Sequence, residues 1–204
     1  MTQIVFLVDD DASCLAATSR MLRASGFAVQ PFRSAREFLA YRDADAPGCI
    51  IVDLQMPEMN GLALQSALAR TRNALPIIFL TGQGNIHSTV QAMRNGAMDF
   101  LEKLAPKEEL IAAVRRAMAC DESQRAERTK TQDVQSRFAK LSKREREILY
   151  HVLRGALNKQ IADELGICER TVKLHRTSIK AKVGVQSVAE LVQLAQKADN
   201  FPIG

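Results

Sequence analysis

Residues 49–61 read Cys49-Ile50-Ile51-Val52-Asp53-Leu54-Gln55-Met56-Pro57-Glu58-Met59-Asn60-Gly61, a short apolar run that ends in one carboxylate and then turns. Four consecutive apolar residues before Asp53 predict a strand that is covered on both faces, as in a parallel sheet. The carboxyl ends of such strands are where open α/β sheets bind their ligands. An Asp after a strand more often caps a turn or a helix, so Asp53 by itself leaves both interpretations open.

A second acidic cluster favours a binding site. Asp9, Asp10 and Asp11 directly follow another apolar run, residues 4–8. If the two strands are neighbours, their carboxylates converge in one place, which is unfavourable unless a cation binds there. The two segments together predict a cation site at one edge of a sheet.

The charge is divided unevenly along the 204 residues, a length that allows two small domains. Residues 1–122 contain 12 Lys and Arg against 14 Asp and Glu, whereas residues 123–204 contain 16 against 9, and the overall formal net charge is +5. The basic half indicates nucleic acid as its partner, although an ordinary solvated basic surface would give the same count.

Composition also bears on the compartment. No apolar run has the length of a membrane span, and we find no secretory signal or lipidation site, so we expect a cytoplasmic protein with no membrane partner. The four cysteines lack CxxC spacing, which disfavours zinc and indicates buried or neutral thiols in a reducing compartment: Cys14, Cys49, Cys120 and Cys168.

Strand and helix patterns alternate five times in the first 120 residues. This alternation predicts an α/β fold with a doubly wound, five-stranded parallel sheet, in which the flavodoxin-like order 2-1-3-4-5 makes the first and third strands neighbours. The expected strands are residues 4–8, 27–32, 49–52, 77–80 and 99–101, and the expected helices are residues 13–25, 34–41, 62–72, 86–95 and a long one from 106.

In this order, Thr81 and Lys103 follow the fourth and fifth strands and reach the same edge as Asp9, Asp10 and Asp53. Clustered carboxylates with a backbone carbonyl suit Mg²⁺. Asp53 is placed to attack a phosphoryl group as a nucleophile, and Lys103 to neutralise phosphate charge. A turn-capping Thr and a surface Lys are the alternatives for single residues, but the strand ends agree on one chemistry.

These residues resemble the receiver domain of two-component response regulators through the segment Asp53-x-x-Met-Pro-x-x-x-Gly. The FixJ-type branch is most similar, through Thr81-Gly82-Gln83-Gly84 and Asp99-Phe100-Leu101-Glu102-Lys103. The resemblance implies that a sensor histidine kinase phosphorylates Asp53 and that Thr81 and Phe100 form a switch pair. It implies Mg²⁺ binding by Asp10, Asp53 and the Gln55 carbonyl, with Asp9 acting through water.

One position departs from the receiver pattern. Receivers usually have a cis Pro after the lysine, whereas Leu104 follows Lys103 here and Pro106 comes two residues later. A cis bond to a non-proline residue costs about 2.5–4 kcal/mol, so we expect a trans Lys103–Leu104 bond and a rearranged loop. Because of this departure, the sequence leaves open whether Lys103 reaches the acidic residues. It also leaves open an alternative interpretation, a DNA-binding protein that is controlled by a ligand or by protein contact and not by phosphate.

The polar segment 117–140 contains neither Pro nor Gly. A disordered tether is one interpretation of such a composition. We favour a continuation of the preceding helix, because nothing breaks it and apolar spacing resumes at Val134, Phe138 and Leu141.

The remainder predicts four short helices, at about residues 143–154, 159–165, 169–183 and 188–198, with Asn158 capping the second. The turn of residues 166–168 is as short as a helix-turn-helix motif requires. One face of the third helix is apolar and the other mixes cations with small and apolar groups, which suit phosphates, guanine edges and thymine methyls. The alternative is an amphipathic helix with a solvated basic face.

The segments at residues 141–149, 158–162 and 171–175 closely resemble the LuxR-type helix-turn-helix. By this resemblance, Lys173, Leu174 and Thr177 read base edges. Cys168 stands where the family often has a Ser N-cap, and a thiol caps a helix poorly. The full set of expected DNA-binding residues is Lys159, Arg170, Thr171, Lys173, Leu174, His175, Arg176, Thr177, Lys180 and Lys182.

We therefore expect a receiver domain at 1–122, a helical linker at 123–140 and an all-α, four-helix DNA-binding domain at 141–204. The expected function is transcription regulation rather than catalysis, with phosphorylation favouring a homodimer that binds paired promoter half-sites and acts on RNA polymerase. An aspartyl-phosphate phosphatase is the enzyme alternative. Such enzymes place an acidic Asp two residues after the nucleophile, where Gln55 cannot transfer a proton.

Overall fold

The computed structural model describes residues 2–41, 46–71, 74–82 and 86–197, in two compact units, Met1–Arg125 and Ala126–Gly204. Three features expected from the sequence lie partly outside the described residues. They are the end of the helix expected over 62–72, the Gln83-Gly84 part of the motif after Thr81, and the last residue of the helix expected over 188–198.

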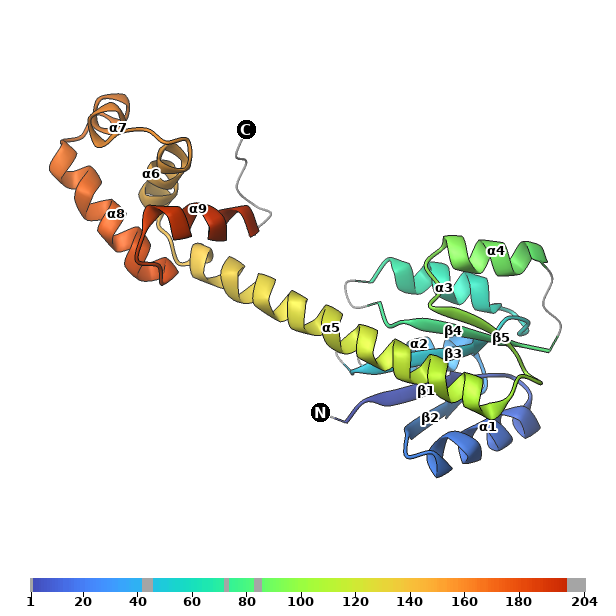
Figure 1. Ribbon diagram of the computed structural model, residues 1–204. Coiled ribbons are helices and arrows are strands. Elements are labelled where there is room, and N and C mark those ends of the chain that lie inside the picture. Colours follow the sequence, from blue (N-terminus) through green and yellow to red (C-terminus); the bar gives the residue numbers. More distant parts are fainter. Residues whose placement is uncertain (1, 42–45, 72–73, 83–85, 198–204) are drawn as a thin grey trace. The chain divides into compact units, whose positions relative to one another are not determined.

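The first unit contains a five-stranded parallel sheet with the order β2-β1-β3-β4-β5, which confirms the expected fold (Figure 1). Val8 pairs with Val52 in the register of the two central strands. Asp9, which follows Val8, therefore lies beside Asp53, the last residue of β3. The strands are β1 (Ile4–Val8), β2 (Ala28–Phe32), β3 (Gly48–Asp53), β4 (Ile77–Thr81) and β5 (Asp99–Glu102).

Two hydrophobic cores hold this sheet, one on each face (Figure 1). Helices α1 (Ala12–Ala24) and α5 (Lys107–Ala139) cover one face. Helices α2 (Ala35–Tyr41), α3 (Gly61–Ala69) and α4 (Ile86–Arg94) cover the other. Every residue of β3 is buried, as its uninterrupted apolar run predicts.

Helix α5 is continuous over 33 residues, which confirms that the polar segment continues the preceding helix. Its residues up to Arg125 belong to the first unit, and the rest belong to the second. Val134 and Phe138, near its end, are buried in the core of the second unit. None of the helices in the described part of the chain is long and apolar enough to span a membrane.

The described part of the second unit, which ends at residue 197, holds four further helices, as expected: α6 (Lys143–Leu153), α7 (Asn158–Leu165), α8 (Glu169–Val183) and α9 (Val188–Lys197). The expected cap of α7 was wrong by one residue, because Leu157 occupies the N-cap position. Its backbone N–H donates to the Gln160 side chain at 2.8 Å. The Asn158 side-chain oxygen Oδ1 instead accepts a hydrogen bond from Arg176 on α8 at 2.7 Å, so the group expected to cap α7 binds α8.

The turn after β3 returns so closely to the strand that only glycine fits at its end. A Cβ added to Gly61 would lie 2.6 Å from the Asp53 carbonyl oxygen and 2.9 Å from the Phe79 ring. The Gly61 N–H also donates to the Leu54 carbonyl at 3.1 Å. The last residue of the motif therefore sets how tightly helix α3 sits behind Asp53.

We predict that Gly61→Ala lowers the free energy of unfolding by about 1–3 kcal/mol, because the methyl group must displace backbone atoms. Urea unfolding followed by circular dichroism measures this change. Gly82→Ala is the matched control, since its Cβ would meet only the flexible Lys103 side chain at 4.0 Å. Equal stabilities of the two variants would contradict the prediction.

Candidate functional site: an acidic pocket and a basic helix

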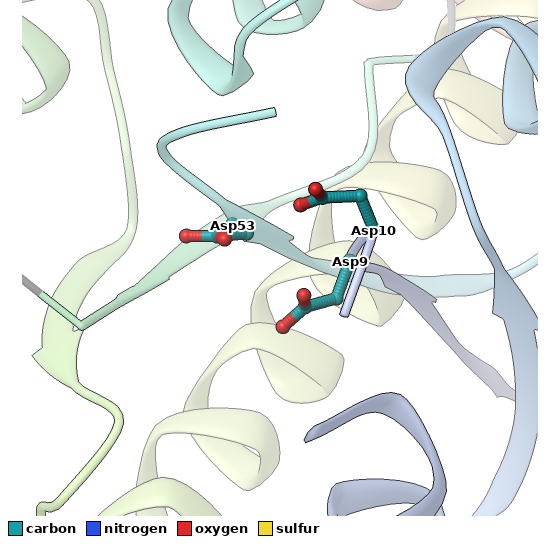
Figure 2. A group of neighbouring side chains, drawn as sticks. All are labelled: Asp9, Asp10 and Asp53. Atoms are coloured by element: carbon teal, nitrogen blue, oxygen red, sulfur yellow. The ribbon is translucent and has the colours of Figure 1, made fainter. Parts of the chain in front are cut away.

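The acidic side chains from β1 and β3 meet at the carboxyl edge of the sheet (Figure 2). One carboxylate oxygen each from Asp9, Asp10 and Asp53 lie within 4.8 Å of one another. Asp9 and Asp53 are buried and Asp10 is exposed, so the group opens to solvent on one side. Three hard oxygen donors at this spacing fit a divalent cation that keeps several of its waters.

Asp11, the third acidic residue of its run, does not join the group. Its carboxylate accepts hydrogen bonds from the backbone N–H groups of Ser13 and Cys14 and so caps helix α1. These bonds lower the pKa of the Asp11 carboxyl. The tertiary structure thus assigns three consecutive aspartates to two different tasks.

Lys103 supplies the positive charge of the pocket. Its ammonium lies 2.8 Å from Asp9 Oδ2 and 3.0 Å from Asp53 Oδ2. Burial alone would lower the lysine pKa, but hydrogen bonds to Asp9 and Asp53 outweigh it and raise the pKa above its usual value. The backbone N–H of Lys103 donates to the backbone carbonyl of Thr81 at 2.7 Å, which holds the start of the loop after β5 against β4.

The position after Lys103 behaves as expected at the peptide bond. No cis peptide bond occurs among the described residues, so Lys103–Leu104 is trans. The Leu104 side chain is 94% exposed. Lys103 nevertheless reaches both Asp9 and Asp53. Leu104 in place of the usual proline therefore does not remove the Lys103 ammonium from the pocket.

Thr81 and Phe100, the expected switch pair, come from neighbouring strands. The Thr81 hydroxyl is buried and has no hydrogen-bond partner among the described residues. The half-buried Phe100 ring packs against Phe79, with 5.9 Å between ring centroids. A buried hydroxyl without a partner costs free energy, so Thr81 would be stabilised by an acceptor placed in the pocket.

The electrostatics of Asp53 also favour a ligand. Burial raises the pKa of its carboxyl, and the hydrogen bond from Lys103 only partly opposes this. The Gln55 N–H lies 3.4 Å from Asp53 Oδ1, whereas the Gln55 side chain is exposed. Asp53 is thus a carboxylate whose ionised form the folded protein tolerates poorly until further positive charge arrives.

Helix α8 carries the second candidate site. Val172, Ile179 and Val183 are buried against the other helices, as the sequence predicts. Arg170, Lys173, Leu174 and Thr177 on its outer side are exposed, and so is Lys159 on α7, while Thr171, His175, Arg176 and Lys180 are half-buried. A cavity of about 350 Å³ beside the helix is lined by Leu157, Asn158, Lys173, Arg176, Thr177, Lys180 and Val188.

Lys182 differs from the other basic residues of α8. Its ammonium lies 2.7 Å from the carboxylate of Glu145 on α6, which also accepts from the Ser178 hydroxyl. The Lys182 contact is the main cause that lowers the Glu145 pKa to about 2. A DNA phosphate would have to compete with this carboxylate for Lys182.

Glu145 lies in the segment 141–149 that resembles the LuxR-type motif, but its role was not predicted from the sequence. The signal is local, since Ser142-x-x-Glu145 is a capping box, and both of its hydrogen bonds are present. That the same carboxylate also reaches α8 follows only from how α6 and α8 cross. Cys168 occupies the N-cap of α8 and makes no side-chain capping hydrogen bond, as expected for a thiol.

Comparison with known proteins gives matches to both units. Residues 5–115 match the family model "Response regulator receiver domain", and residues 139–195 match "Bacterial regulatory proteins, luxR family". Response regulator protein TodT of Pseudomonas putida is 41% identical over 194 residues, which cover 95% of this chain and 86% of TodT.

Two further relatives resemble the chain over nearly its full length. Transcriptional regulatory protein FixJ of Rhizobium meliloti is 37% identical, with 94% of each chain covered. The low-resolution structure of response regulator StyR has 39% sequence identity and a TM-score of 0.86, and the match covers 97% of this chain and 100% of StyR.

We predict that, without divalent cations, Asp53→Asn raises the free energy of unfolding at pH 7 by about 0.5–2 kcal/mol. The folded-state pKa of Asp53 is raised above its usual value of 3.8. Below that value the carboxyl is protonated in both states, and its ionisation destabilises the fold as pH rises through the raised pKa.

Urea unfolding of both proteins at pH 7 and at about pH 3.5 tests the sign. The gap between the variant and the original chain should close at the acidic pH. A gap of equal size at both pH values, or a less stable variant at pH 7, would contradict the prediction.

Proposed function

Since the chain belongs to the two-component response regulators that join a receiver domain to a LuxR-type DNA-binding domain, we propose that phosphorylation of Asp53 controls its binding to promoters. The chain is a transcription regulator with DNA and a kinase as partners. The observation that carries the proposal is the convergence of Asp9, Asp10 and Asp53 around the Lys103 ammonium. We assign residues 1–122 to the receiver, 123–140 to the linker and 141–204 to DNA binding.

The phosphoryl donor in this proposal is the phosphohistidine of a sensor kinase. A carboxylate oxygen of Asp53 forms the new P–O bond as the P–N bond to the histidine breaks, and the leaving imidazole takes up a proton. Lys103 offsets the added negative charge, and the Thr81 hydroxyl, which has no partner in the described part of the chain, donates to a phosphoryl oxygen. Phe100, which packs beside Phe79, follows Thr81 as the second member of the switch.

Mg²⁺ is the cation that fits this pocket. Asp9, Asp10, Asp53 and the Gln55 carbonyl would hold it, and when bound it supplies charge neutralisation for the incoming phosphoryl group. The direct contact between Asp9 and Lys103 is compatible with a role of Asp9 through water. Gln55 stands two residues after Asp53, where aspartyl-phosphate phosphatases have their general acid, and an amide cannot transfer that proton, so we propose signalling rather than turnover.

Phosphorylation is proposed to favour a homodimer through helix α4. Ile86, Val90 and Met93 expose apolar side chains at helical spacing on this helix, and Arg94 beside them is exposed as well. Leu101 on the neighbouring strand β5 is buried in the core beneath α5 and contributes no surface to this face. The dimer would place two copies of α8 on paired half-sites in the cytoplasm, within reach of RNA polymerase.

DNA recognition is assigned to helix α8 and the start of α7. Lys173, Leu174 and Thr177 are proposed to read base edges, the first two with exposed side chains that suit a guanine edge and a thymine methyl. Arg176 and Lys180 line one cavity and are proposed to hold backbone phosphate there. The remaining contacts are assigned to Lys159, Arg170, Thr171, His175 and Lys182.

We predict that Asp53→Asn abolishes the acetyl-phosphate-dependent increase in dimer fraction and in promoter binding, because the variant lacks the acceptor oxygen. Analytical ultracentrifugation and gel-shift titrations, each with and without acetyl phosphate, measure the two effects. Asp11→Asn is the matched control, since Asn caps a helix about as well as Asp. An Asp53→Asn protein that still responds to acetyl phosphate would refute the proposal.

For the DNA contacts, we predict that Lys173→Ala lowers affinity for the preferred site by about 1–3 kcal/mol and relaxes selectivity at one base pair. Selection of bound DNA followed by titration against single-base variants measures this. Lys107→Ala removes an exposed lysine from the start of α5 and should leave affinity and selectivity unchanged. Uniformly weaker binding to all sequences would instead make Lys173 a phosphate contact.

A further inference from the structure

Among the described residues of the first unit, one buried carboxylate takes no part in the proposed phosphoryl chemistry. Asp121 lies on α5 and is 0% exposed. It belongs to the opposite edge of the sheet from Asp53, because its partners come from the start of β3 and the segment before it. A carboxylate without contact to water costs several kcal/mol unless it is paired, so its neighbours identify its role.

Three contacts fasten α5 to this edge. Asp121 Oδ2 accepts from the Gly48 N–H at 2.9 Å and from Arg125 Nε at 2.7 Å. Arg125 Nη2 donates to the Ala46 carbonyl at 2.8 Å. One turn earlier, the Gln3 side chain donates to the Met118 carbonyl at 3.0 Å.

No apolar side chain at position 48 could replace the hydrogen bond between Gly48 and Asp121. Its φ is +148°, and a Cβ there would lie 1.8 Å from the Ile4 carbonyl oxygen. The backbone thus passes between β1 and α5 with no room for a side chain. Gly48 therefore contacts the helix through its backbone N–H and cannot do so through a side chain.

The pair extends the anchored part of α5 beyond its last apolar contact. Met118 is the last α5 residue in the core of the first unit, and Val134 is the first in the core of the second. Between them, residues 126–133 are exposed or half-buried. Helices of fewer than about 12–15 residues are marginal in water, so this polar stretch depends on helical turns that are already held at its ends.

We propose that the Asp121–Arg125 pair is a positioning site that keeps the linker helix folded onto the receiver from Met118 to Arg125. Without it, the part of α5 that is anchored to the receiver would end at Met118 instead of Arg125. The pair thereby sets the residue at which the part of α5 held against the receiver ends. Only the consequence for signalling, that an ordered linker carries the phosphorylation response to the DNA-binding domain, rests on the proposed function.

Hydrogen–deuterium exchange on the full chain tests the proposal with Asp121→Asn and its matched control, Glu122→Gln. Both variants remove one negative charge from the same helical turn, but Glu122 is exposed. Asp121→Asn should speed exchange of amides 119–131 about tenfold or more, since hydrogen bonds to charged groups contribute about 1.5–3 kcal/mol. Glu122→Gln should leave exchange within about twofold of the original chain.

Arg125→Lys is the second variant, because lysine keeps the charge but cannot bridge Asp121 and the Ala46 carbonyl together. It should speed exchange in the same segment several-fold while β1 and β3 stay protected, which separates loss of the linker from loss of the receiver fold. Unchanged linker exchange in both Asp121→Asn and Arg125→Lys, or equal effects of Asp121→Asn and Glu122→Gln, would overturn the proposal.

Phosphorylation of Asp53 by acetyl phosphate is measured on the same samples. The original chain failing to accept the phosphoryl group would refute the proposed function and leave the exchange result intact. Normal phosphorylation of Asp121→Asn with a fast-exchanging linker and a weakened gain in DNA binding is the result that supports both.

Discussion

A carboxylate that is withdrawn from water needs a cation within hydrogen-bond reach, and this constraint shapes the whole protein. The described residues contain four buried carboxylates, and each is ion-paired. Asp9 and Asp53 share Lys103, Asp121 has Arg125, and Glu145 has Lys182. The partners of Asp9, Asp53 and Glu145 come from different segments of the chain. Asp121 and Arg125 lie on successive turns of α5, and both bind the backbone at Ala46 and Gly48.

Two of these sites, Glu145 and Asp53, differ in how completely hydrogen bonds and cations compensate the negative charge. Glu145 accepts several short hydrogen bonds, and its pKa of about 2 shows that the ionised form is favoured. Asp53 has a raised pKa and shares one lysine with Asp9, so its ionised form is poorly compensated. The first holds helix α8 against α6. The second is a site that a bound cation would stabilise, which is consistent with the phosphoryl-accepting role that we propose for Asp53.

Strand β3 and the turn after it hold Asp53 in place although its negative charge is poorly compensated. Strand β3 is buried along its full length, and the turn behind it includes Glu58 at a φ of +62°, an uncommon conformation for a residue other than glycine. Such strain persists only where the surroundings over-determine the backbone. The close approach of Gly61 to the Asp53 carbonyl provides part of that constraint. Stability in the two cores therefore offsets an unfavourable arrangement at the strand ends.

The sequence by itself determined the alternation of strands and helices, the strand order, the acidic pocket and the basic face of α8. These features follow from periodicity, from composition and from residues at strand ends, which act over a few positions or through one topological rule. Only the tertiary structure decided that Asp11 caps a helix instead of joining the pocket, that Asn158 binds Arg176 instead of capping α7, and that Asp121 and Glu145 hold helices in place. The physical reason is that a polar side chain takes the best partner within reach, and which partners are within reach depends on how segments far apart in the sequence cross.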